Sequence, residues 1–426
     1  KMLIRRSFWI VLCLLAMSFI AGIYTRSFVY YRLTYLLFLI LIVSWLWGFL
    51  SIRGLSVNRY NRLVKLQVGS IFEERYELVN LTWYSRLWVQ VEDLSKLPMS
   101  KGSKVISAVG GNQSRAYVVR TLLQQRGVFR LGPTRIITGD PFGIFQFQSE
   151  HPSEKRLMVL PYMAELDEFP SLPGFLPGGR ALRRRTLEVS PHAAGVREYA
   201  PGDPLSRIHW RSTARRDRLM VKEFEQDPQA DVWILLDAHK TSHYRGVSTK
   251  PEIPKDQFWF WTHKPKVTLP PDSFEYLISS SASIANYYLR TGRAVGFASI
   301  GRTFVALSVE RGERQLIKIL ETLALMESEG SLPLLGLIGA QAPMITRGST
   351  VVVLTPVCNE DLEAGVDGLL RRDLRPIVVL TDPVTFGENE MSSRIINHLR
   401  GREVPVSILF YGDDIKAGLE IGFSRQ

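Results

Sequence analysis

Two long apolar runs near the start of the chain restrict its fold more than any other feature of the sequence. Residues Ser7 to Tyr24 and Leu33 to Leu50 are almost free of charge. Each run is long enough to cross a hydrocarbon layer about 30 Å thick as a helix, which satisfies its own backbone hydrogen bonds. A cleaved signal peptide is the alternative for the first run, but the run lacks a small-x-small cleavage pattern and a second run follows at once. The sequence therefore predicts a two-helix transmembrane anchor over residues 1–53.

The placement of cations around the two runs predicts the side of the membrane on which the rest of the chain lies. The flanking cations are Lys1, Arg5 and Arg6 before the first run, Arg53, Arg59, Arg62 and Lys65 after the second, and Arg26 and Arg32 between them. Because cytoplasmic segments carry the excess of Lys and Arg, we expect both ends of the anchor to face the cytoplasm. The formal net charge of +12 fits a protein held against anionic lipid, and we favour this interpretation over nucleic-acid binding.

The sequence offers few residues for catalytic or thiolate chemistry. Cys13 and Cys358 are the only cysteines, which excludes a disulfide framework and a thiolate zinc cluster and agrees with a reducing compartment. There is no phosphate-binding Gly-x-x-x-x-Gly-Lys loop, no Gly-x-Ser-x-Gly elbow and no His-Glu-x-x-His pair. His239 and His243 have the spacing of metal ligands on a helix, but their segment lacks the apolar periodicity of a helix. We therefore expect a non-catalytic protein.

Composition divides the remaining residues into three segments. Residues 54–163 contain short β-rich runs separated by Gly, Asn, Ser or Pro, which predicts an all-β sandwich of general Ig-like form. Within it, the sequence GDPFGIF from Gly139 indicates a hairpin bend in which Phe142 and Phe145 are expected to pack. Residues 164–230 are a connector. Residues 231–426 alternate apolar strands with amphipathic helices, which predicts a parallel, doubly wound α/β sheet covered on both faces.

The part of the connector from Gly195 to Glu225 is expected to form a strand, a turn, a short helix and a second strand. Asp203 is placed to cap this helix, and Pro204 suits its first position. One face of the expected helix carries Arg207, Trp210, Arg211 and Ala214.

Two interpretations of this segment remain open. In the first, the arginines bind a carboxylate, a phosphate or an acidic partner, and Trp210 is a rigid anchor. In the second, the arginines pair with acidic residues of the same segment while Trp210 fills a seam between the connector and the α/β domain. The arginines are Arg207, Arg211, Arg215 and Arg216, and the acidic residues are Glu198, Asp203, Asp217, Glu223 and Glu225. Nearly neutral local charge favours the second interpretation.

The same segment resembles the signature of a membrane-anchored bacterial family called domain of unknown function fifty-eight. The matching positions are Gly202, Asp203, Arg207, Ile208, Trp210, Ala214 and Arg215, with Val221 and Glu223 on the following strand. RGVFRLGP from Arg126 and GDPFGIF from Gly139 are also similar to this family. The resemblance implies a MoxR-type AAA+ ATPase as partner and the bacterial inner membrane as location. The candidate binding residues are Gly202, Asp203, Arg207, Trp210, Arg211, Arg215 and Glu223.

Residues 231–426 resemble a von Willebrand factor type A domain, whose first strand ends in an Asp-x-Ser-x-Ser metal motif. The corresponding residues here are Asp237, Ala238, His239, Lys240 and Thr241. His239 replaces the first Ser and Lys240 adds a positive charge, so the motif is degenerate. Asp237 and Thr241 are the candidate ligands if Mg²⁺ binds, because this ion prefers oxygen donors. We expect no cofactor, with Mg²⁺ as the alternative.

An insertion between Lys240 and Pro271 contains four consecutive aromatic residues, Phe258 to Trp261. Such a cluster can lie in the membrane interface or hold a partner, but packing against the protein's own surface is slightly favoured.

These patterns together predict a membrane-anchored scaffold or adaptor that acts through protein–protein contacts, in assembly or maturation of envelope or other complexes. The alternative is a binding or enzymatic site that uses a divalent metal at the C-terminal edge of the α/β sheet. That site would lie around Asp237, Thr355 and Asp382.

Overall fold

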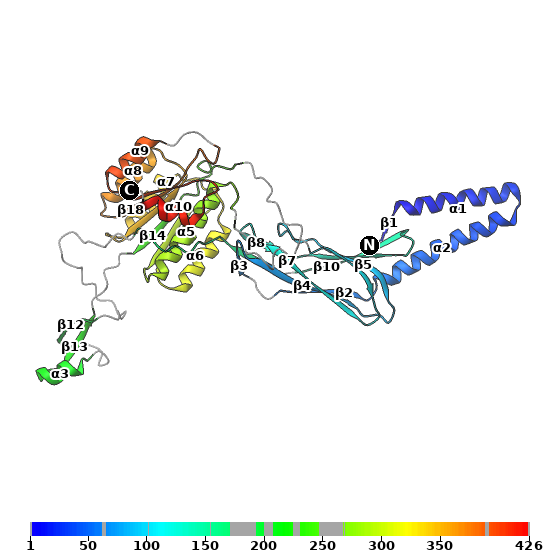
Figure 1. Cartoon of the computed structure of the whole chain (residues 1–426), viewed down its shortest axis with the longest axis horizontal. Helices are drawn as coiled ribbons and strands as arrows, with labels where there is room; N and C mark the ends of the chain where they lie inside the picture. Colours follow the sequence, from blue (N-terminus) through cyan, green and yellow to red (C-terminus); the bar gives the residue numbers. More distant parts are fainter. Residues whose placement is uncertain are drawn as a thin grey trace. The chain divides into compact units, whose positions relative to one another are not determined.

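The computed structural model forms two compact units (Figure 1). The structure describes residues 2–61, 65–100, 102–153, 155–170, 193–199, 208–224, 231–246, 267, 269–387 and 392–424. Unit 1 contains Lys1–Ala164, Val247–Pro271 and Leu320–Met326, and unit 2 contains Glu165–Gly246, Asp272–Ile319 and Glu327–Gln426. The aromatic cluster Phe258 to Trp261 lies outside the described residues.

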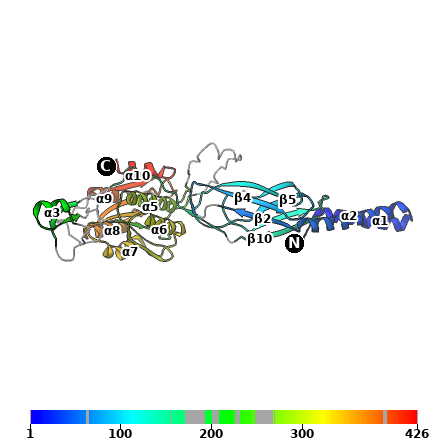
Figure 2. The same ribbon diagram turned by 90° about the horizontal axis from the view of Figure 1, so that it is seen from below.

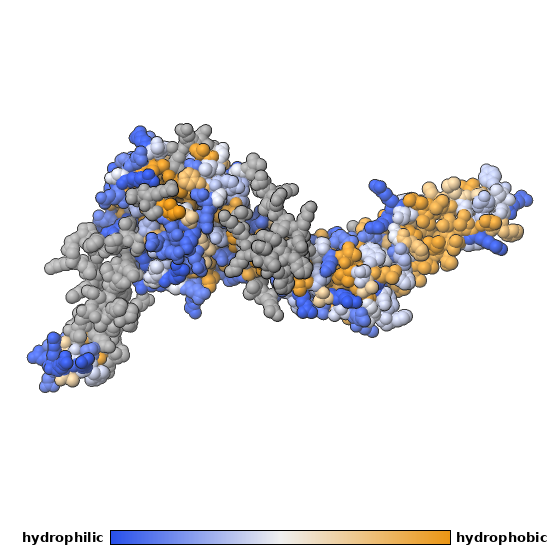
Figure 3. Space-filling model, in the orientation of Figure 1, coloured by the Kyte–Doolittle hydropathy of each residue, from blue (hydrophilic) through white to orange (hydrophobic). Residues whose placement is uncertain are grey.

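The two apolar runs form the long helices α1 (Arg6–Thr25) and α2 (Phe28–Ile52). With 20 and 25 residues, they are about 30 and 37 Å long, enough to cross a hydrocarbon layer. The helices pack against each other through small residues, and Ser18 Oγ donates to the Tyr30 carbonyl at 2.9 Å. Most of their other side chains are exposed and apolar, so the helix pair forms the continuous orange region in Figure 3. The predicted pair of apolar helices is confirmed.

Between residues 55 and 160 the described elements are strands, which confirms the predicted all-β segment. The strands are β2 (Leu55–Tyr60), β3 (Lys65–Gln67), β4 (Ile71–Asn80), β5 (Arg86–Asp93), β6 (Lys104–Val109), β7 (Ser114–Leu122), β8 (Gly127–Arg130), β9 (Thr134–Gly139), β10 (Phe145–His151) and β11 (Arg156–Leu160). They form sheets of order β1-β10-β9-β5-β6, β2-β4-β7 and β3-β11-β8, in which β1 (Met2–Ile4) precedes α1. Buried residues of the first two sheets share one hydrophobic core. These two sheets therefore pack as layers.

A buried ionic cluster lies between the layers and was not predicted from the sequence. Arg59 of β2 donates to Glu74 of β4 at 2.8 Å and to Asp93 of β5 at 2.9 Å. The three side chains are 5%, 4% and 1% exposed, respectively. The guanidinium also lies 4.8 Å from the centre of the Tyr76 ring. Arg59 was expected among the cations flanking the membrane, and the structure corrects this because its charge is compensated inside the sandwich.

The cluster holds its two carboxylates in different environments. Burial raises the pKa of Glu74 above its usual value, although Arg59 opposes the shift. Burial also pushes the pKa of Asp93 upward, but hydrogen bonds from Ser100 and Ser95 and the charge of Arg59 outweigh burial and leave this pKa below its usual value. Ser100 Oγ donates to Asp93 Oδ2 at 2.6 Å. Both carboxylates therefore depend on donors supplied by the fold.

Unit 2 contains a six-stranded sheet of order β16-β15-β14-β17-β18-β19. Its strands are β14 (Val232–Leu236), β15 (Val295–Ile300), β16 (Phe304–Glu310), β17 (Thr350–Thr355), β18 (Arg375–Thr381) and β19 (Val406–Leu409). Neighbouring strands are parallel except for the edge strand β16, which is antiparallel to β15. The alternation of strands and helices predicted after Asp231 is confirmed, and the antiparallel edge strand is a difference from the wholly parallel sheet that was expected.

Helices cover both faces of this sheet. They are α5 (Ser273–Arg290), α6 (Glu313–Leu325), α7 (Leu334–Gln341), α8 (Glu360–Leu370), α9 (Ser393–Gly401) and α10 (Ile415–Ser424). Helices α7, α8 and α9 share a core with one face, whereas α5 and α10 contact each other and the strands. Figure 2 shows α7 and α10 on opposite sides of the sheet. Because α5 follows β14 and α8 follows β17, the chain changes faces between these neighbouring strands, and such a switch point opens a crevice at the carboxyl ends of the strands.

Candidate functional site

The signature segment forms a small hairpin with a helix inserted between its strands (Figure 1). Strand β12 (Ala193–Glu198) pairs antiparallel with β13 (Met220–Phe224), and α3 (Trp210–Arg216) lies between them in sequence. Ile208 forms a β-bridge with Val221, and the His209 amide donates to the Met220 carbonyl at 2.8 Å. Thr213 Oγ1 accepts from the Met220 amide at 3.1 Å. These bonds fix α3 against the hairpin, and the predicted order of strand, helix and strand is confirmed.

The predicted start of the helix is wrong. Helix α3 begins at Trp210, and His209 is its N-cap, with Nδ1 accepting from the Ser212 amide at 3.2 Å. A helix from Pro204 through Ala214 cannot form because the backbone at Ile208 is extended and paired with Val221. Gly202, Asp203 and Arg207 lie outside the described residues, and so does the side chain of Glu223.

The exposed surface of α3 is cationic and aromatic. Trp210 is 67% exposed, and Arg211, Arg215 and Arg216 are also exposed. Arg211 and Arg215 are four residues apart and therefore share one face of the helix. Within the described part of the hairpin, Arg218 forms an ion pair with Glu198 at 3.0 Å. The interpretation of Trp210 as an anchor for a partner needs such an exposed side chain. The structure thus presents an aromatic side chain beside three arginines.

A second candidate lies at the switch point of the α/β sheet. Asp237 follows β14 and is 2% exposed. Its Oδ1 accepts from the His239 amide at 2.9 Å, and its Oδ2 accepts from Thr355 Oγ1 at 2.8 Å. The two side chains meet because β14 and β17 are parallel in register, with Leu236 opposite Leu354. Burial raises the pKa of Asp237, although these hydrogen bonds oppose the shift.

Thr241, the second candidate ligand of the expected metal motif, is not among the hydrogen-bond partners of the Asp237 carboxylate. Thr241 is exposed, and its hydroxyl lies 3.2 Å from His239 Nδ1. The Asp237 carboxylate instead receives hydrogen bonds from the hydroxyls of Thr355 and Ser242. Asp382 follows β18, and β17 lies between β18 and β14 in the sheet. The Asp382 Oδ2 atom accepts from the Thr385 amide at 3.0 Å. Among the described residues, no group of three or more His, Cys, Asp and Glu is arranged to hold a metal ion.

His243 has a structural environment that its spacing from His239 did not indicate. Its Nε2 lies 3.0 Å from the Asp237 carbonyl oxygen, which can only accept, so Nε2 carries the proton. Nδ1 lies 3.4 Å from Ser273 Oγ. Burial lowers the pKa of His243 to about 4. The ring is therefore neutral near pH 7, and hydrogen bonds within unit 2 occupy both nitrogens.

Cys358 follows β17 near the same sheet edge. Its Sγ lies 3.7 Å from the Ser392 carbonyl oxygen. Burial raises the pKa of Cys358 to about 11. The thiol is therefore protonated near pH 7, whereas a cysteine nucleophile acts as the thiolate.

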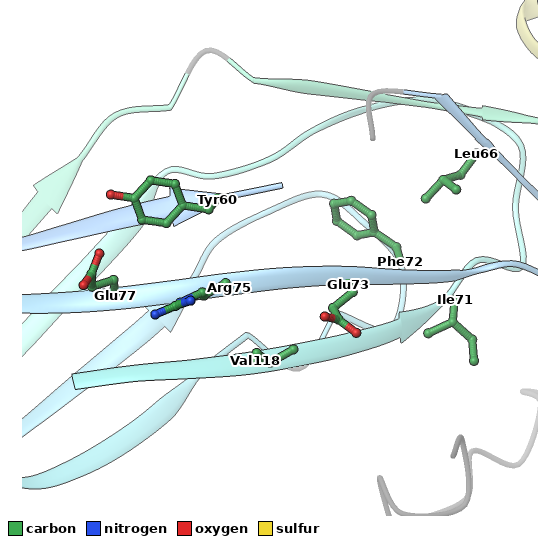
Figure 4. A pocket seen from close by; sticks show the side chains of 8 residues that line it. All are labelled: Tyr60, Leu66, Ile71, Phe72, Glu73, Arg75, Glu77 and Val118. Atoms are coloured by element: carbon green, nitrogen blue, oxygen red, sulfur yellow. The ribbon is translucent and has the colours of Figure 1, made fainter. Parts of the chain in front are cut away.

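A depression lies over the outer face of the β2-β4-β7 sheet (Figure 4). Glu73, Arg75 and Glu77 line it because alternate residues of β4 point to the same face. Tyr60 and Val118 line it from the two neighbouring strands. Glu73 accepts from Arg120 at 2.9 Å. The lining thus combines apolar side chains with two carboxylates and a guanidinium.

Comparison with known proteins places the hairpin in a family. Residues 195–254 match the family described as Protein of unknown function DUF58. Uncharacterized protein YeaD of Bacillus subtilis (strain 168) is 25% identical over 213 residues, which cover 49% of this chain and 45% of that protein. The chain thus spans about half the length of this curated relative. The match to the DUF58 family covers the signature segment and the residues that follow it.

Solved structures show only weak similarity to the chain. The CARDB domain of a Pyrococcus furiosus protein, in complex with di-metal ions, has 12% identity and a TM-score of 0.18, over 25% of this chain and 91% of that one. The cupredoxin domain of amoB from Nitrosocaldus yellowstonii has 8% identity and a TM-score of 0.19, over 26% and 89%. At these scores neither structure contributes to the assignment of fold or function.

Proposed function

We propose that this chain is a non-catalytic scaffold or adaptor, anchored in the bacterial inner membrane by α1 and α2, with its soluble domains in the cytoplasm. It acts through protein–protein contacts in the assembly or maturation of envelope or other complexes. Its partner is a MoxR-type AAA+ ATPase, which the family resemblance implies. In this proposal the all-β segment is Ig-like, and residues 231–426 form a von Willebrand A-like domain.

The exposed Trp210 beside Arg211, Arg215 and Arg216 carries the proposal. Trp and Arg are enriched among the residues that contribute most to binding at protein interfaces. Arginine side chains bind carboxylates through two parallel hydrogen bonds, so the surface fits an acidic partner. The hairpin also holds α3 by backbone bonds through His209, so the recognition helix does not need to be ordered on binding.

Trp210→Ala is expected to leave the stability of the chain unchanged within about 0.5 kcal/mol, because an exposed side chain contributes little to the folded state. Capture of the ATPase from detergent-solubilised membranes is expected to fall at least about tenfold, as for a residue that dominates an interface. Phe304→Ala is the matched control, since Phe304 of β16 is another exposed aromatic residue of unit 2, at 53%. Equal capture by wild type and both variants would reject α3 as the recognition surface.

The position of Asp237 beside Thr355 favours a second candidate, a divalent ion at the switch point. Asp237 would provide the carboxylate, and Thr355 and Ser242 would provide hydroxyls. If this candidate is correct, calorimetric titration of the whole chain with Mg²⁺ will give heat and raise the melting temperature. Asp237→Asn, which keeps the shape of the side chain and removes its charge, will abolish both. No heat with wild-type protein would exclude the candidate.

A further inference from the structure

We propose that the end of the β-sandwich next to α1 and α2 is set into the membrane interface, where two of its turns contact lipid. The turns are residues 81–85, between β4 and β5, and residues 140–144, between β9 and β10. Their lipid-contacting side chains are Leu81, Trp83 and Phe142. This inference rests on the proposed crossing of the membrane by the two helices, and it adds a direct contact between the soluble sandwich and the bilayer.

The packing of the helices locates the level at which α1 enters the bilayer. Thr34 Oγ1 donates to Ser18 Oγ at 3.1 Å across the antiparallel pair. Arg6 begins α1 twelve residues before Ser18, so it is level with the residue twelve positions after Thr34, which is Leu46. Helix α2 continues to Ile52, about 9 Å beyond this level. The last turns of α2 thus lie in the headgroup layer, where they meet the sandwich.

The turn between β9 and β10 reaches this layer and continues past it. The Arg5 amide donates to the Ile144 carbonyl at 3.3 Å, and the Phe145 ring centre lies 5.5 Å from that of Phe8. Ile144, Phe145 and Phe147 form one cluster with residues of both helices, which are Phe8, Val11, Ile40, Leu41, Phe49 and Ile52. Val11 lies more than one turn beyond Arg6 on the hydrocarbon side. The cluster therefore extends to the depth of the acyl chains.

This turn holds an apolar side chain outward. Asp140 is 1% exposed, and its carboxylate accepts from the amides of Phe142 at 2.9 Å and Phe145 at 2.6 Å. Gly143 has a positive φ of 69°, a conformation that glycine adopts readily. Phe142 is 61% exposed, which corrects the expectation that it packs, whereas Phe145 is buried as expected. A turn fixed by a buried carboxylate thus presents a phenyl ring to the surroundings of the helices.

The turn between β4 and β5 lies at the end of α2. Tyr84 Oη donates to the Leu50 carbonyl at 2.9 Å, and the Arg86 guanidinium donates to the Arg53 carbonyl at 2.6 Å. Both bonds satisfy carbonyls at the helix terminus. In the same turn, Leu81 is 67% exposed and Trp83 is 84% exposed.

Lipid is the occupant that these observations favour over a protein partner. Both turns contact the ends of α1 and α2, whose apolar surface is lipid-facing if the helices span the bilayer. Trp and Tyr are enriched at membrane interfaces, where an apolar ring and a polar group are both accommodated. Arg5, Arg6 and Arg53 lie at the same end and suit the headgroups of anionic lipid.

The test measures contact with acyl chains in the whole protein. A chain with Cys13→Ser and Cys358→Ala receives one new cysteine, as Phe142→Cys or Trp83→Cys, which is labelled with bimane. Val118→Cys is the control within the sandwich, where the side chain is 45% exposed. Val118 pairs with Arg75, which is five residues before Asn80 at the end of β4, so it lies about 17 Å along the sheet from the turn that follows Asn80. Phe19→Cys, 49% exposed on α1, is the membrane control. Each protein is reconstituted into phosphatidylcholine–phosphatidylglycerol vesicles with or without bromines on the upper acyl chains.

We expect brominated lipid to reduce emission from the labels at positions 142, 83 and 19, and to leave emission at position 118 unchanged. Quenching at 19 without quenching at either 142 or 83 would overturn the insertion of the turns and leave the membrane anchor intact. Quenching at 118 equal to that at 142 would also overturn it, because the effect would not be specific to the turns. Absence of quenching at 19 would refute the membrane crossing itself.

Discussion

Arg59→Met is expected to destabilise unit 1 by about 3–5 kcal/mol, because it leaves two carboxylates buried without their cation. Glu74 and Asp93 are 4% and 1% exposed, and Arg59 donates to both. Methionine fills much of the volume of the arginine stem, so the loss is mainly electrostatic. Hydrogen exchange of β4 and β7 amides measures the effect within the sandwich, since protection of central strands reports the free energy of unfolding.

Arg120→Met is the matched control for this variant. Arg120 bonds Glu73 at 2.9 Å on the outer face of the same sheet, where the two side chains are 17% and 54% exposed. Pairs with an exposed partner contribute at most about 1 kcal/mol, so β4 protection should change little. Equal losses in the two variants would show that the buried cluster has no special role.

The pH dependence of the Arg59→Met variant distinguishes lost charge compensation from lost packing. Without the guanidinium, the folded-state pKa of Glu74 rises further above its unfolded value, and Asp93 loses one of the interactions that lower its pKa. The folded variant then binds more protons than the unfolded chain, so it should recover stability relative to wild type as the pH falls through the folded pKa values. In wild type, the lowered pKa of Asp93 has the opposite effect on stability. The stability that Asp93 contributes is lost as the pH falls below the usual range for aspartate. If the loss in free energy of unfolding of the variant relative to wild type is the same at every pH, the loss comes from packing alone.

The cluster had a signal in the sequence that was not used. Side chains alternate along a strand, so Glu74 has the same phase as Phe72, Tyr76 and Leu78, which are buried. An acid in the apolar phase predicts an internal cation. The identity of that cation could not be predicted, because Arg59 and Asp93 come from different strands and only the packing of two sheets brings them together.

Elements with strong periodicity were predicted well, and elements defined by tertiary pairing were not. The apolar strands β14, β17 and β18 fit the alternation of strands and helices predicted for residues 231–426. Helix α7 was missed because LLGLIGAQ is apolar on all sides and contains two glycines, which leaves no amphipathic pattern. The start of α3 was misplaced because the Asp203-Pro204 pair is a strong local capping signal, whereas the bridge from Ile208 to Val221 is formed by residues far apart in sequence.

The candidate sites were also predicted where the local sequence shows them and missed where they depend on tertiary pairing. The sequence identified Trp210 and the neighbouring arginines as one group, but only the structure shows that Trp210 is exposed. The sequence also placed Asp237 at the end of a strand, and in a parallel sheet this position lies at the edge where ligands bind. The pairing of Asp237 with Thr355 requires the register of β14 and β17, and the register of parallel strands separated by more than a hundred residues is not encoded by local pattern.

Acidification from pH 7.5 to 4.5 is expected to remove about 2–3 kcal/mol of the stability that neutral His243 gives to unit 2. Burial lowers the pKa of His243 from 6.5 in the unfolded chain to about 4 in the folded protein. Between these values the unfolded chain binds more protons, so stability is present above pH 6.5 and is lost as the pH falls toward 4. The Nε2 bond to the Asp237 carbonyl favours the charged ring, but burial and the positive charges of Arg245 and His239 outweigh it.

His243→Gln separates this contribution from every other titrating group. The glutamine amide can replace Nε2 as donor to the Asp237 carbonyl, yet it has no proton to gain in this range. Chemical denaturation of both proteins in detergent gives the difference in their free energies of unfolding at each pH. This difference should shift by about 2–3 kcal/mol in favour of the variant between pH 7.5 and 4.5. Parallel pH profiles for the two proteins would mean that His243 remains uncharged, or equally charged, in both states.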